Sequence, residues 1–116
     1  MGDRPVLLSQ AHVTDLEVQA LTRAVTSGWV APLGPEVDGF EQDICGFTGA
    51  RHALALSSGT AAIHLALLGL DVKPGDEVIV PTLTFGATAF AVTYTGARPI
   101  FIDVEDQSWG LDSIVL

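Results

Sequence analysis

The sequence predicts an α/β fold, with N-terminal helices followed by the first βαβαβ part of a mostly parallel sheet. From residue 52 onward, short continuous apolar runs alternate with longer apolar stretches, and Gly, Pro and Asp separate them. Continuous apolar strands are typical of parallel sheets that helices cover on both faces. We therefore expect an N-terminal helical segment over residues 1–50 and the first part of a larger α/β domain over residues 51–116.

Composition narrows the classes of partner. The formal net charge is -9, from 14 acidic and 5 basic residues. Such a surface repels phosphate backbones, so nucleic acid is not an expected partner. The single cysteine, Cys45, cannot form an internal disulfide, and the first ten residues have no charged-then-apolar leader. Both observations predict a cytoplasmic protein.

Residues 78–97 carry no charged side chain and are numerous enough to span a bilayer. Pro81 and Gly86 interrupt them, and no basic cluster flanks them. A buried strand, a turn and a buried helix explain this composition better than a membrane span.

The N-terminal part predicts two helices. Thr14 and Glu17 match a capping box, which begins a helix over Asp15–Ser27 that Gly28 ends. Pro and Gly residues then predict a loop, and Pro35 suits the first turn of a second helix. That helix would carry one apolar stripe, formed by Val37, Phe40, Ile44 and Phe47.

From residue 52 the alternation predicts three parallel strands with helices between them. The strands are expected over 52–57, 77–81 and 98–104, and the helices over 59–70 and 84–97. Residues 108–116 are expected to be a loop that enters a further helix. Uncovered sheet edges would then require either more sequence or a partner chain.

Ligands bind open parallel sheets outside the carboxyl ends of the strands. The segment Ser57–Thr60 is expected at this edge and opens a helix, where backbone N–H groups lack intrahelical acceptors. Gly59 allows close approach, and the amides of Gly59 and Thr60 favour an anion such as phosphate. The alternative is a simple N-cap by Ser58, and the spacing favours neither.

Phe85 is expected at the same edge, at the start of the next helix. A large aromatic ring there could stack on a flat ligand. The alternative is a core phenylalanine, which the residue type alone favours. Three acidic residues follow the third strand: Asp103, Glu105 and Asp106. Their presence is explained by capping or by charge on a solvated loop, so we assign them no catalytic role.

Metal and nucleophile motifs are missing from the sequence. His12, His52, His64 and Cys45 lack metal-ligand spacing, and His64 is expected to be packed within an apolar helix. Neither a G-x-S-x-G elbow nor a G-x-x-x-x-G-K-[ST] loop is present.

Four motifs in series resemble the DegT/DnrJ/StrS family of pyridoxal-phosphate-dependent sugar aminotransferases. They are "GPEVDGFEQD", "ALSSGTAAIHLAL", "KPGDEVIVPTLTFGATAFAV" and "GARPIFIDVEDQSWGLD". The resemblance runs from about Gly28 to Leu111 and implies the aspartate-aminotransferase fold.

The resemblance implies roles for particular residues. The phosphate of pyridoxal phosphate would sit on the Gly59 and Thr60 amides, with help from the Ser58 or Thr60 hydroxyl, and Phe85 would stack on the pyridine ring. The loop that includes Trp29 and Gly34 would border the sugar-nucleotide site, across the interface of a homodimer. Asp103 would be structural.

The implied reaction transfers an amino group from a donor such as glutamate to a nucleotide-linked keto sugar. Such catalysis requires a lysine that binds the cofactor covalently. The only lysine, Lys73, lies in a turn expected at the opposite edge of the sheet. The family's catalytic lysine, and its aspartate that pairs with the pyridine nitrogen, are expected beyond Leu116, so this chain alone would be inactive.

Two alternatives stay open. Some relatives use the same cofactor for sugar dehydration, and in them a histidine replaces the lysine. The chain could instead be a truncated remnant that serves as a binding or oligomerisation module.

Overall fold

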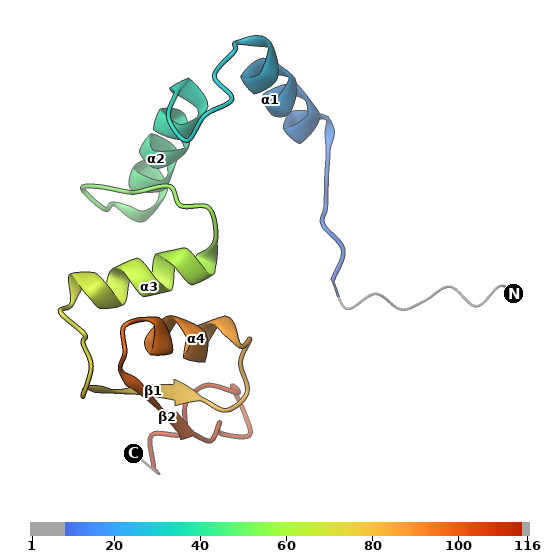
Figure 1. The fold of residues 1–116 in the computed structure, drawn as a ribbon. Helices are drawn as coiled ribbons and strands as arrows, with labels where there is room; N and C mark the ends of the chain where they lie inside the picture. The colour runs from blue at the N-terminus through green and yellow to red at the C-terminus, as the bar shows by residue number, and fades with distance from the viewer. Residues whose placement is uncertain (1–8, 115–116) are drawn as a thin grey trace, which may run out of the picture. The chain divides into compact units, whose positions relative to one another are not determined.

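The computed structural model describes residues 9–114, which form two compact units. The first unit ends at Ala55 and the second begins at Leu56. Helices α1 and α2 belong to the first unit, and α3, β1, α4 and β2 belong to the second (Figure 1).

Helix α1 spans Asp15–Thr26, and a capping box closes its N-terminus. The Thr14 N–H donates to Glu17 Oε2 at 2.6 Å, and the Leu16 N–H donates to Thr14 Oγ1 at 3.2 Å. At the other end Ser27 is the C-cap, and Gly28 follows with a φ of 80°. The predicted capping box is confirmed, and the predicted helix end is correct to one residue.

Helix α2 spans Pro35–Thr48, with Pro35 in its first turn as predicted. Gly49 ends it in the left-handed conformation, and its N–H donates to the Cys45 carbonyl at 2.9 Å. The predicted apolar stripe lies in contact with solvent, since Phe40 is 55% exposed and Phe47 is 90% exposed.

The second unit is built on two parallel strands. Strand β1 spans Glu77–Pro81 and β2 spans Arg98–Ile102, paired from Glu77 opposite Arg98 to Pro81 opposite Ile102. Both were predicted, although β2 is two residues shorter than expected. The parallel pairing confirms the predicted strand direction.

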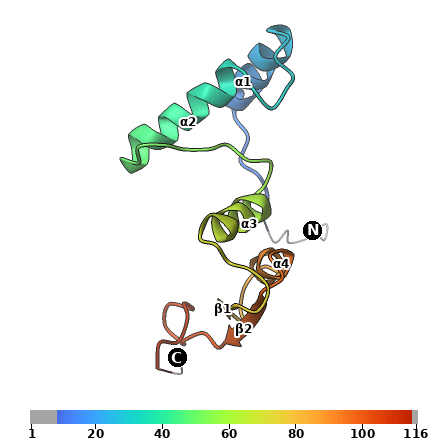
Figure 2. The ribbon, with the colours of Figure 1, turned by 60° about the vertical axis from the view of Figure 1, so that its left-hand side comes forward.

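Two helices of the second unit complete its layers. Helix α4 (Ala87–Tyr94) packs on both strands, and α3 (Gly59–Gly69) packs against α4 (Figures 1 and 2). The small core between α4 and the sheet consists of Val80, Val92 and Ala97, with Leu67, Val72 and Val78 packed against it.

The prediction of a strand over residues 52–57 is wrong. Within residues 9–114 the sheet contains only β1 and β2, and residues 52–57 form no strand. A strand requires a neighbour for its backbone groups, and here the Ala55 N–H donates instead to Glu41 Oε1 at 2.8 Å. Leu54 is accordingly 65% exposed.

The chain after β2 forms turns. Val104 pairs with Leu111 in an isolated antiparallel bridge. The helix expected at the end of the chain includes residues 115–116, which lie outside the described residues.

The uncharged stretch over residues 78–97 forms β1, a turn and α4, as predicted. Within residues 9–114, no helix is long and apolar enough to cross a membrane.

Candidate functional site

An open pocket of about 400 Å³ lies in the second unit, between the first turn of α3 and the segment that joins β1 to α4. All four residues that the sequence predicted to hold a cofactor line this pocket. Its lining consists of Ser58, Gly59, Thr60, Ile63, Phe85, Ala87 and Thr88. Two segments that are 25 residues apart in the chain therefore meet here, because α3 packs against α4, the helix that follows β1.

Ser58 is the N-cap of α3. Its Oγ accepts from the Ala61 N–H at 3.2 Å, and its carbonyl accepts from the Ala62 N–H at 3.1 Å. The bond from Ala62 is the first regular bond of the helix, and the Ser58 hydroxyl satisfies one of the N–H groups that a helix leaves without partners, that of Ala61. The capping alternative is correct for Ser58, and its hydroxyl proton is still available to a ligand.

The first two residues of α3, Gly59 and Thr60, carry N–H groups that Ser58 does not cap. Among residues 9–114, neither amide has a hydrogen-bond acceptor, and the Thr60 hydroxyl has no partner. A Cβ placed on Gly59 would meet no atom within 4 Å, so there is open space above this backbone. An amide pair at a helix N-terminus with open space above it is suited to an anion.

Phe85 lies two residues before α4 begins, rather than at the first residue of the helix. Its side chain is 83% exposed, so this phenylalanine is not part of the core that the described residues form. An exposed aromatic ring beside two free amides forms a surface that a flat, phosphate-bearing molecule could contact on two sides.

Two threonine contacts hold the segment that carries Phe85. The Thr82 hydroxyl donates to Asp103 Oδ1 at 3.0 Å, and the hydroxyls of Thr84 and Thr88 lie 2.9 Å apart. Asp103 Oδ1 also accepts from the Val104 N–H at 2.9 Å. These contacts support the structural role expected for Asp103.

Glu105 caps the following turn. Its pKa is lowered, chiefly because the Ser108 hydroxyl donates to the carboxylate, and further because the amides of Gln107 and Ser108 donate to it. A carboxylate engaged in this way stabilises the turn, in keeping with the absence of a catalytic role for it in the sequence interpretation.

Trp29 and Gly34 contact each other within the first unit. Gly34 has a φ of 137°, and a Cβ on it would lie 3.1 Å from Trp29 Cβ. Glycine is therefore required here both by its backbone conformation and by the indole beside it. Trp29 is 55% exposed.

Lys73 follows α3 and precedes β1, in the predicted turn, where its Nζ pairs with Asp71 Oδ2 at 2.9 Å. Phe85 follows the opposite end of β1. Helix α3 has 11 residues and, at 1.5 Å per residue, separates this turn from Ser58 by about 16 Å. Lys73 is therefore at the wrong end of the unit to meet a ligand in the pocket.

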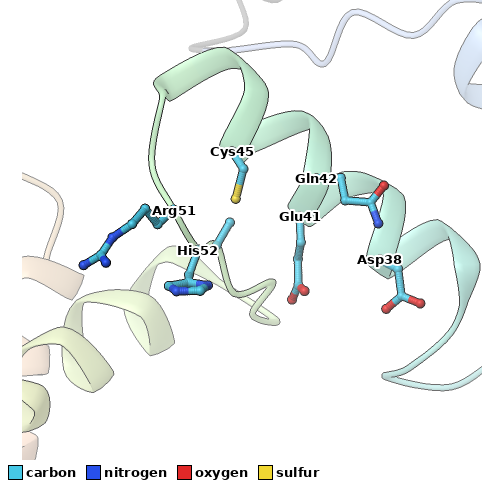
Figure 3. Close-up of a pocket in the computed structure, with 7 residues that line it drawn as sticks. Asp38, Glu41, Gln42, Cys45, Arg51 and His52 are labelled. Carbon is cyan, nitrogen blue, oxygen red and sulfur yellow. The ribbon is translucent and has the colours of Figure 1, made fainter.

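A second pocket, of about 470 Å³, lies within the first unit, and the sequence interpretation missed it. Asp38, Glu41 and Cys45 extend from one side of α2, and His52 lies on that side near Cys45 (Figure 3); Arg51 also lines the pocket. Asp38, Glu41 and Cys45 are spaced three and four residues apart, which places them on one face of a helix, and this spacing could have predicted the pocket. Within residues 9–114, no three His, Cys, Asp or Glu side chains are placed to hold a metal ion.

The parallel unit and its pocket place the chain among α/β proteins that bind ligands at the carboxyl ends of their strands. Comparison with known families is more specific. The chain belongs to the DegT/DnrJ/EryC1/StrS aminotransferase family, whose model matches residues 12–114.

Curated relatives include two enzymes named for amino sugars. GDP-perosamine synthase of Caulobacter vibrioides is 42% identical over 117 residues, which cover 100% of this chain and 32% of that enzyme. UDP-4-amino-4-deoxy-L-arabinose–oxoglutarate aminotransferase of Shewanella sediminis is 41% identical over 105 residues, which cover 90% of this chain and 27% of that enzyme. The chain thus spans under a third of the length of these relatives.

Solved structures agree with this assignment. A Streptococcus pneumoniae protein assigned as a sugar aminotransferase, solved in PLP and PMP forms, superposes with a TM-score of 0.82 at 33% identity. The match covers 92% of this chain and 27% of that protein. 3-Amino-5-hydroxybenzoic acid synthase superposes with a TM-score of 0.79 at 36% identity, over 95% of this chain and 29% of that one. The predicted fold class and the family resemblance are confirmed.

Proposed function

We propose that this chain is the N-terminal part of a pyridoxal-phosphate-dependent aminotransferase that acts on a nucleotide-linked keto sugar. The observation that carries the proposal is the pocket in which the free amides of Gly59 and Thr60 lie with the exposed ring of Phe85. In this proposal residues 51–116 are the first part of the cofactor-binding domain, and residues 1–50 carry the helices and the loop that borders the substrate.

The donors present fit a phosphate group. Gly59 and Thr60 offer two N–H groups at the positive end of α3, and Thr60 and Ser58 each offer a hydroxyl proton. Hydrogen bonds to a charged group contribute roughly 1.5–3 kcal/mol each. Two amides and one hydroxyl would therefore hold a phosphate without any basic side chain in the pocket lining.

The ring of Phe85 would orient the cofactor, by stacking on its pyridine face while the phosphate is held at α3. When bound, pyridoxal phosphate supplies the electron sink that amino-group transfer needs. The contribution of this chain is to bind and orient the cofactor from its phosphate and one ring face.

The residues that would complete the reaction are proposed to lie in sequence beyond Leu116. They are the lysine that binds the cofactor covalently and the aspartate that pairs with its ring nitrogen. The position of Lys73 at the far end of α3 supports this, since no other lysine is available here. Alone, the chain would bind the cofactor non-covalently and would not transfer amino groups.

We propose that the acceptor substrate is a nucleotide-linked keto sugar, because the relatives above are named for nucleotide-linked amino sugars or their synthesis. We also propose an amino-acid donor such as glutamate. The loop that Trp29 and Gly34 stabilise would border the nucleotide-sugar site across a homodimer interface. The full-length protein would act in the cytoplasm.

The test uses the complete gene product. We expect it to purify with a visible absorption band of bound pyridoxal phosphate, and borohydride should fix the cofactor on a lysine outside residues 1–116. A complete protein that stays colourless and takes up no pyridoxal phosphate would contradict the proposal.

The same experiment separates the two alternatives. Cofactor uptake without a lysine that borohydride can label, together with a histidine at its place, would favour a sugar dehydratase. An intact mass near 12.1 kDa from an undamaged gene would favour a truncated binding or oligomerisation module.

A further inference from the structure

Packing within residues 9–114 does little to orient the ring of Phe85, because 83% of the side chain is exposed there. The segment that carries it, residues 82–86, lies between β1 and α4 and has no strand ladder. A ring that stacks on a ligand binds it more tightly when the ring already has one orientation. Otherwise the conformational entropy lost on ordering the ring weakens binding.

One contact ties this segment to α4 directly beside Phe85. The Thr84 hydroxyl, on the residue before Phe85, lies 2.9 Å from the hydroxyl of Thr88, in the first turn of α4. The Phe85 carbonyl accepts from the Thr88 N–H at 3.0 Å. Side-chain and backbone bonds to Thr88 therefore enclose Phe85 in a closed turn.

Two neighbours fix the ends of this turn. At the start, the Thr82 N–H donates to the Ile102 carbonyl at 2.9 Å and its hydroxyl donates to Asp103, which joins the segment to the end of β2. At the far end, the ring of Phe90 lies against Gly86, where a Cβ would come within 3.0 Å of Phe90 Cε2. Among the described residues, the bond between Thr84 and Thr88 is the side-chain hydrogen bond that joins the residue before Phe85 to the first turn of α4.

We propose that the hydroxyl pair of Thr84 and Thr88 positions Phe85 for stacking on a flat, phosphate-bearing ring. Thr88 lines the pocket together with Phe85, so the pair acts at the site itself. Thr84 and Thr88 are positioning residues, and the proposal rests on the proposed function of the pocket. It specifies which part of the ligand they serve: the ring, and not the phosphate.

The test uses the full-length protein, freed of cofactor, with Thr84→Val and Thr88→Val, which remove the hydroxyl at nearly constant shape. The probes are pyridoxamine 5′-phosphate, which needs no lysine, and inorganic phosphate, which lacks the ring. Each valine variant should bind pyridoxamine phosphate about threefold to tenfold more weakly, since one hydrogen bond is lost. Affinity for inorganic phosphate should be unchanged.

Three controls sharpen the result. Thr84→Ser should restore wild-type affinity, because it keeps the hydroxyl. The double variant should be no weaker than either single one, because both remove the same bond. Thr93→Val removes a threonine hydroxyl from the same helix outside the pocket lining, where Thr93 donates only to the Phe90 carbonyl, and should leave the affinity unchanged.

A measurement on the ligand-free protein tests the role of the two threonines independently of whether the pocket binds the cofactor. Hydrogen exchange of the amides over residues 84–88 should quicken in Thr84→Val and not in Thr93→Val, whether or not the protein binds the cofactor. Unchanged exchange together with unchanged pyridoxamine phosphate affinity would overturn the positioning role. An equal loss of affinity for inorganic phosphate would also overturn it, since the whole pocket would then have collapsed.

Discussion

Gly59 illustrates how much one residue without a side chain can determine. Its amide and that of Thr60 have no acceptor among the described residues, and a Cβ at this position would meet nothing within 4 Å. The glycine is therefore not required by the packing of this chain. Its value lies in the open space above the backbone, which is where an anion would approach.

Gly59→Val is expected to lower the affinity of the full-length protein for pyridoxamine phosphate by at least about tenfold, because a branched side chain would block the phosphate from the amides. The ligand-free melting temperature should change little, since the new side chain meets no neighbour. Isothermal titration and thermal melts measure the two effects. Gly46→Val, in α2, adds the same side chain where a Cβ also meets nothing within 4 Å, and should leave affinity unchanged. Unchanged affinity in Gly59→Val would refute the phosphate site.

Phe85→Ala should weaken pyridoxamine phosphate binding while the fold stays intact, because an 83% exposed ring contributes little to the core. Affinity for inorganic phosphate, which has no ring to stack, should be unchanged. Far-UV circular dichroism, thermal melts and ligand titration decide between the roles. A loss of folded structure would instead restore the interpretation of Phe85 as a core residue.

At the scale of elements, the ends of α1 and α3 show how local sequence builds two different N-termini. In α1 the carboxylate of Glu17 accepts from the Thr14 N–H and the hydroxyl of Thr14 accepts from first-turn amides, so most of the exposed donors have partners within the helix. In α3 only Ser58 acts as a cap, and two amides stay free. The absence of an acidic residue in the first turn of α3 keeps that end attractive to an anion.

The capping box of α1 should be sensitive to acid. The pKa of Glu17 is lowered, first because the Thr14 hydroxyl donates to the carboxylate and second because the Thr14 backbone N–H does. A folded pKa below the ordinary value of 4.5 means that the box stabilises α1 above about pH 4.5 and loses this contribution as the pH falls through the folded pKa.

Carboxyl titration by NMR should therefore give Glu17 a midpoint below the ordinary value of 4.5. Thr14→Ala should raise the Glu17 midpoint toward its ordinary value and quicken amide exchange in the first turn of α1. An unmoved midpoint in Thr14→Ala would rule out the hydroxyl as the cause.

At the scale of the whole molecule, little apolar surface is buried. Within residues 9–114 the buried hydrophobic residues, all in the second unit, are Val80, Ala87, Ala91, Val92 and Ala97. Large apolar side chains such as Phe47, at 90%, and Leu70, at 76%, stay exposed. Monomeric proteins rarely leave so many large apolar side chains uncovered, which agrees with a chain that spans under a third of its relatives' length.

The 116-residue chain made alone should therefore bind a hydrophobic dye and show a mass that rises with concentration, because its apolar faces will associate. Raising the salt concentration should increase this association by screening the net charge of -9. Sedimentation and dye fluorescence measure both effects. A monomer without dye binding would contradict the expectation, and the complete gene product is the control.

The sequence by itself determined the features that depend on neighbouring residues. The capping box at Thr14, the turn at Gly28, Pro35 at the start of α2 and strand β1 were all predictable, because their causes lie within a few residues. The resemblance of four motifs also identified the family and four of the seven residues that line the pocket.

Only the tertiary structure decided features that need a partner distant in the sequence. The apolar run over residues 52–57 forms no strand within the described residues, and its Ala55 N–H instead donates to Glu41 Oε1, 14 residues earlier in the chain. Phe85 is exposed because α4 starts two residues later and turns its own apolar face to β1 and β2. The contact between Thr84 and Thr88 likewise became visible only once this turn was placed in space.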